Sequence, residues 1–183
     1  MLLDIHTHQL PSCPATALLS CSMWNIPVPD ETVFLSAGIH PWYVSDTDYP
    51  KQLEWVQTMA ETDTRTIAIG EAGLDKLCQT PFDLQIKVFR DIIRIAEQYR
   101  MPLILHAVRT TNELIALKKE FQPQSPWIIH GFRGKRELAQ SLVRQGFYLS
   151  FGTRYQSEAL QSIPTDHILI ETDEAEQPVH LLY

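Results

Sequence analysis

Residues 102–106 read PLILH, an apolar run with the length of a short strand that ends in a histidine. The same pattern occurs in residues 66–71 (TIAIGE) and 126–130 (PWIIH), each ending in a residue that can ligate a metal. Further runs of strand length occupy residues 1–5, 17–22, 33–39, 147–151 and 167–171. Several of these runs are continuous rather than alternating, which is typical of parallel strands covered on both faces.

Amphipathic stretches lie between the later runs. The clearest is residues 81–100, where apolar residues recur at helical spacing; others are residues 50–61, 110–121, 135–145 and 157–163. We expect Thr80 to cap the helix over residues 81–100, and Thr110 and Glu113 to form a capping box at the start of the helix over residues 110–121. Strands that alternate with helices imply βαβ units in a parallel sheet. Eight such strands suggest a (β/α)8 TIM barrel, although periodicity leaves an open doubly wound sheet as an alternative.

The chain is short for such a barrel, because it has 183 residues and a barrel typically takes about 250. The first two connections, residues 6–16 and 23–32, are short and rich in proline, so full helices are not expected there. We therefore predict a single domain over residues 1–183, a barrel without its first two outer helices and its C-terminal helix. The strand faces left bare should be covered by the proline-containing loops, by the tail 178–183, or by a second subunit of a homo-oligomer.

The composition is that of a folded protein, with 44% hydrophobic and 20% charged residues, which excludes a disordered or collagen-like chain. The net charge of −7 argues against a protein that coats nucleic acid non-specifically. No apolar run approaches the roughly 18 residues of a membrane span, and Asp4 interrupts any signal-peptide core. The three cysteines form no Cys-x-x-Cys pair, which fits reduced thiols and a cytoplasmic location.

Metal-binding side chains stand at the ends of the predicted strands: His6, His8, Glu71, His106, His130 and Asp173. Alternation along the first strand places Asp4, His6 and His8 on one side, and barrel enzymes gather their catalytic groups at the carboxyl ends of strands. Mixed imidazole and carboxylate ligands suit zinc, manganese, iron or nickel, with magnesium possible but less natural for so many nitrogens. Six ligands are too many for one ion with an open coordination position, so the set favours two divalent ions that share a bridging carboxylate.

Candidate substrate contacts follow the same strands. The basic residues Arg109, Arg133, Lys135, Arg136 and Arg154 should lie near the barrel rim, as phosphate ligands or simply as solvated loop residues. Arg133 is the best placed of them. Trp42 and Tyr43 could stack on a base, but we interpret them as packing under a loop. Asp4 and Asp75 are interpreted as carboxylates that orient the metal ligands or have a structural role.

The segments DIHTH, GIHPW, IGEAGLD, LHAVR, IHGFRG, GFYLSFG and ILIETDE resemble, in this order, the TatD family of metal-dependent deoxyribonucleases. The resemblance runs from Met1 to about Glu174 and implies a TIM-barrel hydrolase of the metallo-dependent amidohydrolase superfamily. It implies that His6, His8, Glu71 and Asp173 hold one metal, and that Glu71 bridges to a second metal held by His106 and His130. It also places His40 near the leaving group.

The chain departs from the family pattern at three positions. Val108 stands where the family commonly has an arginine, with Arg109 one residue later. Arg133 replaces a serine, and Glu174 replaces a small residue. These changes affect the substrate side more than the metal ligands.

The leading hypothesis is a two-metal phosphodiesterase that acts on DNA or on a smaller phosphodiester. Asp173 would act as the catalytic base, and Arg133, Arg109 and His40 would contact the substrate. One alternative is an amidohydrolase-type enzyme that cleaves a C–N or C–O bond in a small molecule. Another is a non-catalytic domain that retains a metal site.

Overall fold

The computed structural model describes residues 3–10, 14–25 and 33–183, and these form an eight-stranded parallel barrel. Each strand pairs with the next one in the chain. The strands are β1 (Asp4–Thr7), β2 (Ala17–Cys21), β3 (Phe34–Ala37), β4 (Thr66–Asp75), β5 (Leu103–Val108), β6 (Trp127–Ile129), β7 (Phe147–Phe151) and β8 (Ile168–Ile170). A bridge between Thr7 and Asp173 joins β1 to the end of β8. The predicted TIM barrel is therefore confirmed, and the open sheet is excluded.

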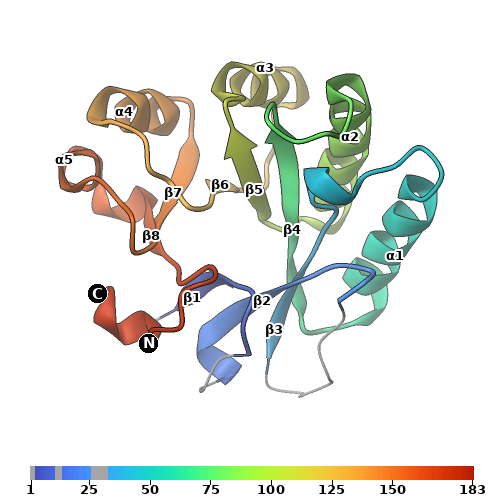
Figure 1. Ribbon diagram of the computed structural model, residues 1–183, viewed down its shortest axis with the longest axis horizontal. Coiled ribbons are helices and arrows are strands. Elements are labelled where there is room, and N and C mark those ends of the chain that lie inside the picture. The colour runs from blue at the N-terminus through green and yellow to red at the C-terminus, as the bar shows by residue number, and fades with distance from the viewer. Residues whose placement is uncertain (1–2, 11–13, 26–32) are drawn as a thin grey trace.

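The described residues form five α-helices, which lie around the upper and lateral sides of the barrel in the view of Figure 1. They are α1 (Tyr49–Thr62), α2 (Phe82–Tyr99), α3 (Thr111–Phe121), α4 (Arg136–Arg144) and α5 (Ser157–Leu160). Short 3-10 turns also occur in the described ranges: η1 (Pro14–Thr16), η2 (Pro41–Tyr43), η3 (Thr165–His167) and η4 (Val179–Leu181). In the described part of the chain, no α-helix follows β1, β2 or β8, as predicted from the short connections.

The helix-poor side of the barrel is nevertheless covered. Every residue of β1 and β2 is buried. On the outer face, β2 and β3 pack with Met59 of α1 in one apolar cluster that includes Leu19, Cys21 and Leu35. At the tail, the hydroxyl of Tyr183 donates a hydrogen bond to the carbonyl of Leu3 and accepts one from its N–H. The tail therefore contacts the residue before β1. Of the proline-containing loops that were expected to cover the strands, Pro11, Cys13, Pro27 and Pro29 lie outside the described residues.

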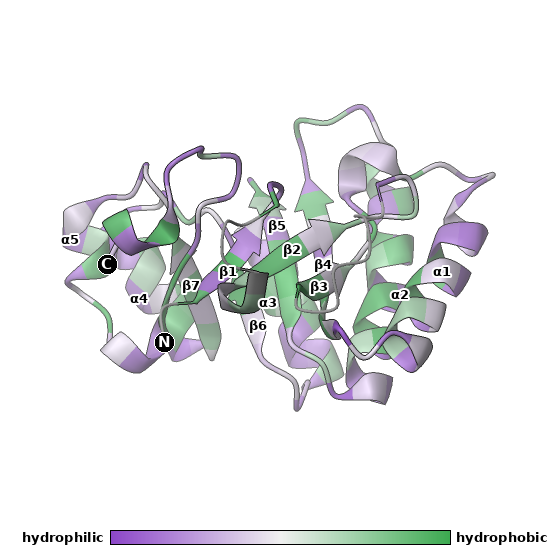
Figure 2. Cartoon of the chain, turned by 90° about the horizontal axis from the view of Figure 1, so that it is seen from below, coloured by the Kyte–Doolittle hydropathy of each residue, from purple (hydrophilic) through white to green (hydrophobic). Residues whose placement is uncertain are grey.

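Two apolar layers explain why the strand sequences are continuous. Ile104 of β5 joins Ile5, Leu18, Ala68 and Ile128, from four other strands, in a cluster inside the barrel. Its neighbours Leu103 and Leu105 instead belong to the main cluster under the helices, where the Trp127 ring lies edge-on to Phe89 and Phe147. The strands are largely hydrophobic in Figure 2, while the helices carry both hydrophobic and hydrophilic residues.

An extra residue in β4 turns Glu71 into the barrel. Ile69 pairs with Leu103 and Ala72 pairs with Leu105, so three steps along β4 match two along β5. Such a bulge breaks the alternation of faces. Ala68 consequently lies in the interior cluster while Ala72 lies in the outer one, although strict alternation would put both on the same face. Strict alternation would also have turned Glu71 away from the site.

Gly70 makes the bulge sterically possible. Its φ is +135°, and a Cβ built there would lie 2.6 Å from the carbonyl oxygen of Ile104. A similar irregularity occurs in β1, where Asp4 pairs with Ala17 and Thr7 with Leu19. The strands β1 and β4, which carry His6 and Glu71, thus both depart from regular pairing near the site.

Two predicted helix caps are wrong. The helix α2 begins at Phe82 with Pro81 in the cap position, and the carbonyl of Thr80 instead accepts a hydrogen bond from Gln85. Thr110 does precede α3, but its buried hydroxyl donates to the carbonyl of Leu74, 3.1 Å away, rather than to its own helix. For Thr110, a partner distant in sequence thus replaces the local cap.

In the described part of the chain, none of the helices combines the length and apolar character needed to cross a bilayer.

Candidate metal centre

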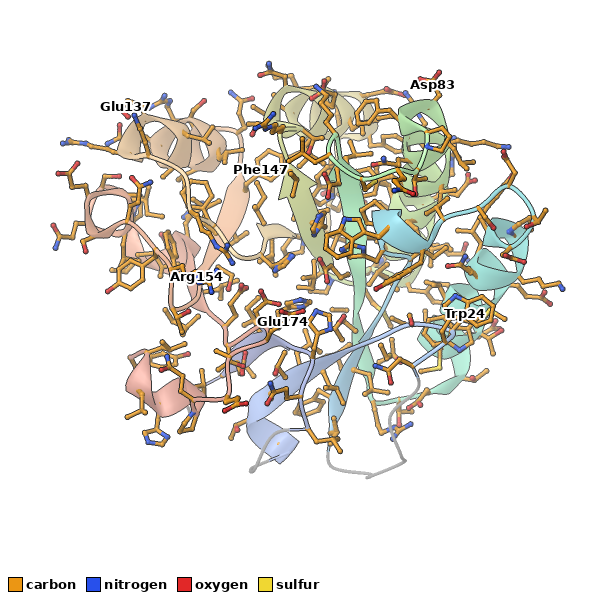
Figure 3. All side chains as sticks on the ribbon, in the orientation of Figure 1. Trp24, Asp83, Glu137, Phe147, Arg154 and Glu174 are labelled. Atoms are coloured by element: carbon orange, nitrogen blue, oxygen red, sulfur yellow. The ribbon has the colours of Figure 1, made fainter. Side chains whose placement is uncertain are left out.

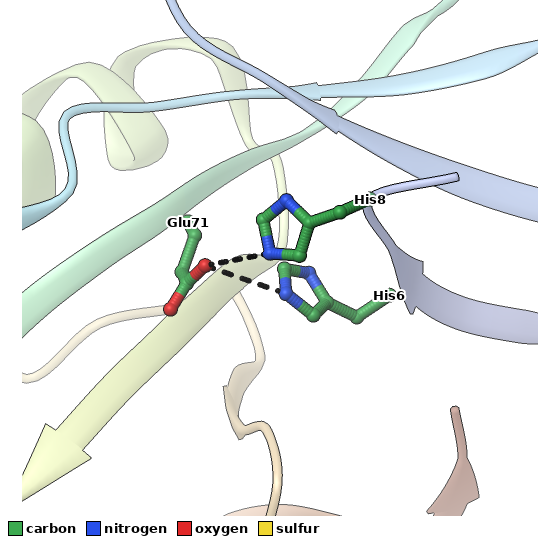
Figure 4. Close-up of side chains that lie close together, drawn as sticks. All are labelled: His6, His8 and Glu71. Carbon is green, nitrogen blue, oxygen red and sulfur yellow. Dashed lines mark ion pairs between the residues drawn. The ribbon is translucent and has the colours of Figure 1, made fainter. Parts of the chain in front are cut away.

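Glu71 stands at the centre of the site, and its two carboxylate oxygens face different histidines. Oε2 lies 3.4 Å from Nε2 of His6 and 3.3 Å from Nε2 of His8 (Figure 4). Oε1 lies 2.8 Å from Nδ1 of His106 and 2.8 Å from Nε2 of His130. This division matches the arrangement expected of a bridging carboxylate.

The barrel brings all six predicted ligands together. His6 and His8 come from β1 and the residue after it, Glu71 from the β4 bulge, and His106 from β5; His130 and Asp173 follow β6 and β8. The Oδ1 atom of Asp173 lies 3.9 Å from Nε2 of His6 and 3.7 Å from Nε2 of His8. Asp173 therefore lies on the His6 and His8 side of Glu71, and His106 lies on the other side. His130 contacts Oε1 of Glu71 and also forms a possible ligand group with His6 and Asp173.

The geometry on the His6 side fits a metal ion. Both ring nitrogens of His6 are buried and have no hydrogen-bond partner among the described residues. Two ligand atoms that share one tetrahedral ion at about 2.0–2.2 Å stand roughly 3.3–3.6 Å apart. The contacts of His6 and His8 with Oε2 of Glu71 have this spacing, while the 2.8 Å contacts of His106 and His130 are hydrogen-bond distances. His6, His8 and Glu71 form one of three ligand groups that could hold an ion.

The charges of the site depend strongly on Glu71. Burial disfavours the ionised carboxylate of Glu71, but its close contacts with the rings of His106, His130, His40 and His6 outweigh burial and hold its pKa well below the usual value. The hydrogen bond to Glu71 raises the pKa of His8. Burial would lower the pKa of His130, yet its contacts with Glu171 and Glu71 raise it to about 10. The carboxylate is therefore anionic, as a bridging ligand must be.

Two further carboxylates contact the far nitrogens of the ligand histidines. Oδ2 of Asp75 lies 3.3 Å from Nε2 of His106, as the sequence interpretation expected. Glu171 lies behind His130, 3.5 Å from its Nδ1, and also accepts a 2.6 Å hydrogen bond from the N–H of Gly131. Such partners fix the tautomer and orientation of a ligand imidazole.

Glu171 was not among the candidates from the sequence, and Asp4 has the structural one of its two expected roles. The sequence signal that could have revealed Glu171 is a glutamate directly after the apolar run ILI, two residues before Asp173. In the structure this glutamate is fully buried. Asp4 does not orient an imidazole; its carboxylate accepts hydrogen bonds from the N–H and hydroxyl of Thr172, at 3.0 and 2.6 Å, and from the His6 N–H. Asp4 thereby connects β1 to the end of β8.

His40 contributes a donor to the site. Its Nδ1 accepts a 3.2 Å hydrogen bond from the backbone N–H of Trp42, so the proton of the neutral ring is assigned to Nε2. Nε2 lies 3.2 Å from Oε1 of Glu71. Burial lowers the pKa of His40, which favours this neutral form. Although His40, Glu71 and His106 form another possible ligand group, a protonated Nε2 has no lone pair for a metal.

A cavity of about 980 Å³ opens above these groups. Arg109 and Arg133 line it, whereas Lys135, Arg136 and Arg154 are absent from the described residues that line it. Glu174 adds a carboxylate to the lining. The interpretation of Trp42 and Tyr43 as buried packing is wrong, because both are more than half exposed in the cavity lining, as is Trp24, which the sequence did not single out. A tight turn holds these aromatics on the surface rather than under a loop.

A nearly closed eight-stranded parallel barrel with imidazoles and carboxylates gathered at the carboxyl ends of its strands defines a shortened TIM barrel with a candidate metal centre. Residues 17–179 match the model of the TatD related DNase family, and the chain belongs to this family.

Individual relatives agree with this assignment. The metal-dependent hydrolase YabD of Bacillus subtilis is 32% identical over 150 residues, which cover 77% of this chain and 58% of YabD. Deoxyribonuclease Tat-D of Schizosaccharomyces pombe is 26% identical over 155 residues, covering 75% of this chain and 50% of that protein. The crystal structure of the TatD homologue YjjV from Escherichia coli has the same fold, with a TM-score of 0.74 at 21% identity over 93% of this chain and 78% of that chain. The chain spans about half the length of YabD and of Tat-D.

Proposed function

We propose that the protein is a divalent-metal-dependent phosphodiesterase that acts on DNA or on a smaller nucleotide-like ester. The observation that carries this proposal is the division of Glu71 between two histidine groups at the base of a cavity lined by Arg109 and Arg133. Family membership and the deoxyribonuclease name of the fission-yeast relative support the same reaction class.

The residues present fit two metal ions. His6, His8, Glu71 and Asp173 would hold one ion, and Glu71, His106 and His130 the other, with zinc, manganese or magnesium as candidates. When bound, such ions make water nucleophilic near neutral pH and neutralise the charge of phosphate oxygens.

The chain's own groups have distinct tasks. Asp173 is 27% exposed and lines the cavity, so its carboxylate can orient the attacking water and accept its proton. Arg133 and Arg109 provide planar guanidinium groups that match phosphate oxygens in pairs. The Nε2–H of His40 can donate a hydrogen bond to an oxygen of the bound ester.

The test uses the full chain, stripped of metal with a chelator and reloaded with Zn²⁺, Mn²⁺ or Mg²⁺. The substrates are an oligodeoxynucleotide, a chromogenic phosphodiester, a lactone and an amide. We expect metal-dependent cleavage of the phosphodiesters and its loss in His106→Ala and in Asp173→Ala. Matched controls are His180→Ala and Asp166→Ala, which remove exposed residues of the same types outside the cavity lining.

Three outcomes would contradict the proposal. Unchanged cleavage in either site variant would remove these residues from the reaction. Hydrolysis of the lactone or amide in place of the phosphodiesters would favour an amidohydrolase-type enzyme. Stoichiometric metal without turnover of any ester would favour a domain that keeps its metal for structure.

A further inference from the structure

Exposed aromatic side chains gather at the cavity of the candidate metal centre. Trp24, Trp42 and Tyr43 are 61%, 56% and 59% exposed, and all three line the cavity. Among the described residues, the other exposed aromatic side chains are Tyr155 and Tyr183, and neither lines it. Single exposed hydrophobic residues are common, but exposed aromatic side chains gathered at one cavity are typical of a surface that receives a ligand.

Trp42 is held in a fixed orientation. Its Nε1–H donates a 2.7 Å hydrogen bond to Oδ2 of Asp75, and its backbone N–H is bonded to His40. The ring lies edge-on to His40, with centroids 4.9 Å apart, and edge-on to His106 at 6.0 Å. One edge of the indole is thus tied to the metal centre while more than half of the side chain stays open to solvent.

Trp24 stands on a different segment of the same cavity. It follows β2, whereas Trp42 belongs to η2 after β3. In Figure 3, Trp24 lies on the α1 side of the barrel, and Arg154, which is not part of the cavity lining, lies on the opposite side. The aromatic residues therefore occupy the β2 and β3 side of the cavity, and Arg109 and Arg133 follow β5 and β6.

This combination matches a nucleotide rather than a simple ester. Flat aromatic faces bind the face of a base, and guanidinium groups bind the phosphates on either side of it. A cavity of about 980 Å³ is also larger than a small phosphodiester needs. A paired base cannot offer its face to a side chain, so the ligand must be unpaired.

We propose that Trp42 and Trp24 form a stacking platform for unpaired bases of a single-stranded nucleic acid whose phosphodiester lies at the Glu71 centre. The inference rests on the proposed phosphodiesterase function. Trp42 also acts as a positioning residue, because its indole N–H and the His106 ring share the carboxylate of Asp75.

The test measures binding by the full-length, metal-free chain, so that it does not depend on turnover. The probe is a fluorescein-labelled oligothymidylate, followed by anisotropy, and the comparison ligand is an abasic deoxyribose-phosphate oligomer of the same length. An oligouridylate arm distinguishes RNA from DNA. The variants are Trp42→Ala, Trp24→Ala and Trp42→Phe, with Tyr155→Ala as the matched aromatic control.

We expect Trp42→Ala and Trp24→Ala each to weaken oligothymidylate binding roughly 5- to 150-fold, the range expected for loss of one stacked base. Binding of the abasic oligomer should be weaker in the unaltered chain and should not change in the variants. Trp42→Phe keeps a stacking ring but loses the N–H, so it should retain most of the binding while lowering kcat of the metal-loaded protein. Tyr155→Ala should bind like the unaltered chain.

Two results would overturn the stacking platform. One is equal binding of oligothymidylate by all variants and the unaltered chain, and the other is that the unaltered chain binds the abasic oligomer as tightly as oligothymidylate. Such a result, together with metal-dependent cleavage of a base-free phosphodiester, would leave the proposed function standing. Tryptophan-dependent binding without cleavage of any phosphodiester would instead overturn the proposed function alone. Thermal unfolding of each variant shows that the loss of binding is not a loss of fold.

Discussion

Glu171 lies directly behind His130, with its Oε1 3.5 Å from Nδ1 of that ring, while Nε2 of His130 faces Glu71 at 2.8 Å. Glu171 is fully buried, and it also accepts the hydrogen bond from the Gly131 N–H. His130 is thus held between two carboxylates, one on the metal side and one behind it. This arrangement fixes which nitrogen is available to a metal.

Replacing Glu171 by glutamine should weaken metal binding by about 10- to 100-fold, because outer carboxylates orient ligand imidazoles and raise their basicity. Calorimetric titration of the metal-stripped protein with Zn²⁺ or Mn²⁺ measures the effect. Glu176→Gln, a change at an exposed glutamate nearby, serves as the control. If the affinity of Glu171→Gln equals that of the unaltered chain, Glu171 does not position His130.

Metal affinity should rise with pH across the neutral range. The contacts with Glu171 and Glu71 raise the pKa of His130 to about 10 despite its burial, so the metal-free ring is protonated at neutral pH. A metal must displace that proton. As long as the pH is below the pKa of His130, each increase of one pH unit should therefore raise the metal affinity about tenfold. Removal of the charge in Glu171→Gln lowers the pKa of His130 and should flatten the pH dependence between about pH 7 and 9. An equally steep dependence in this variant would contradict the assignment.

Arg133 should matter for phosphate binding and Arg136 should not, since only Arg133 of these two lines the cavity. Loss of a hydrogen-bonded charge contact costs about 1.5–3 kcal/mol. Arg133→Ala should therefore lower kcat/KM for a phosphodiester roughly 10- to 150-fold, and Arg133→Lys should recover part of it. Equal effects of Arg133→Ala and Arg136→Ala would show only a loss of general surface charge.

The outer face of β3 should behave as core although this side of the barrel is poor in helices. Leu35 is fully buried in the cluster with Met59. Leu35→Ala should lower the free energy of unfolding by about 2–5 kcal/mol, measured in urea on the metal-free protein. The exposed Leu77 offers a control, because Leu77→Ala should change stability by less than about 0.5 kcal/mol. A small effect at Leu35 would mean that the covering of β2 and β3 is weak.

The sequence alone identified most strands, because parallel strands buried on both faces are apolar along their whole length and end where polar residues begin. The histidines after PLIL and PWII mark those ends directly. Closure of the barrel brings such ends to one rim, so the candidate ligand set followed from position in the chain. The short connections also predicted correctly where α-helices are missing in the described residues.

The tertiary structure decided what depends on contacts between distant segments. Regular alternation would not have turned Glu71 into the site, and the bulge beside Gly70 arises from pairing with β5. The contact of Glu171 with His130 and the exposure of Trp24 and Trp42 likewise depend on neighbours far away in the chain. Local periodicity records which residues are apolar, but the direction of a side chain and its partners are fixed only when the strands pair and the barrel closes.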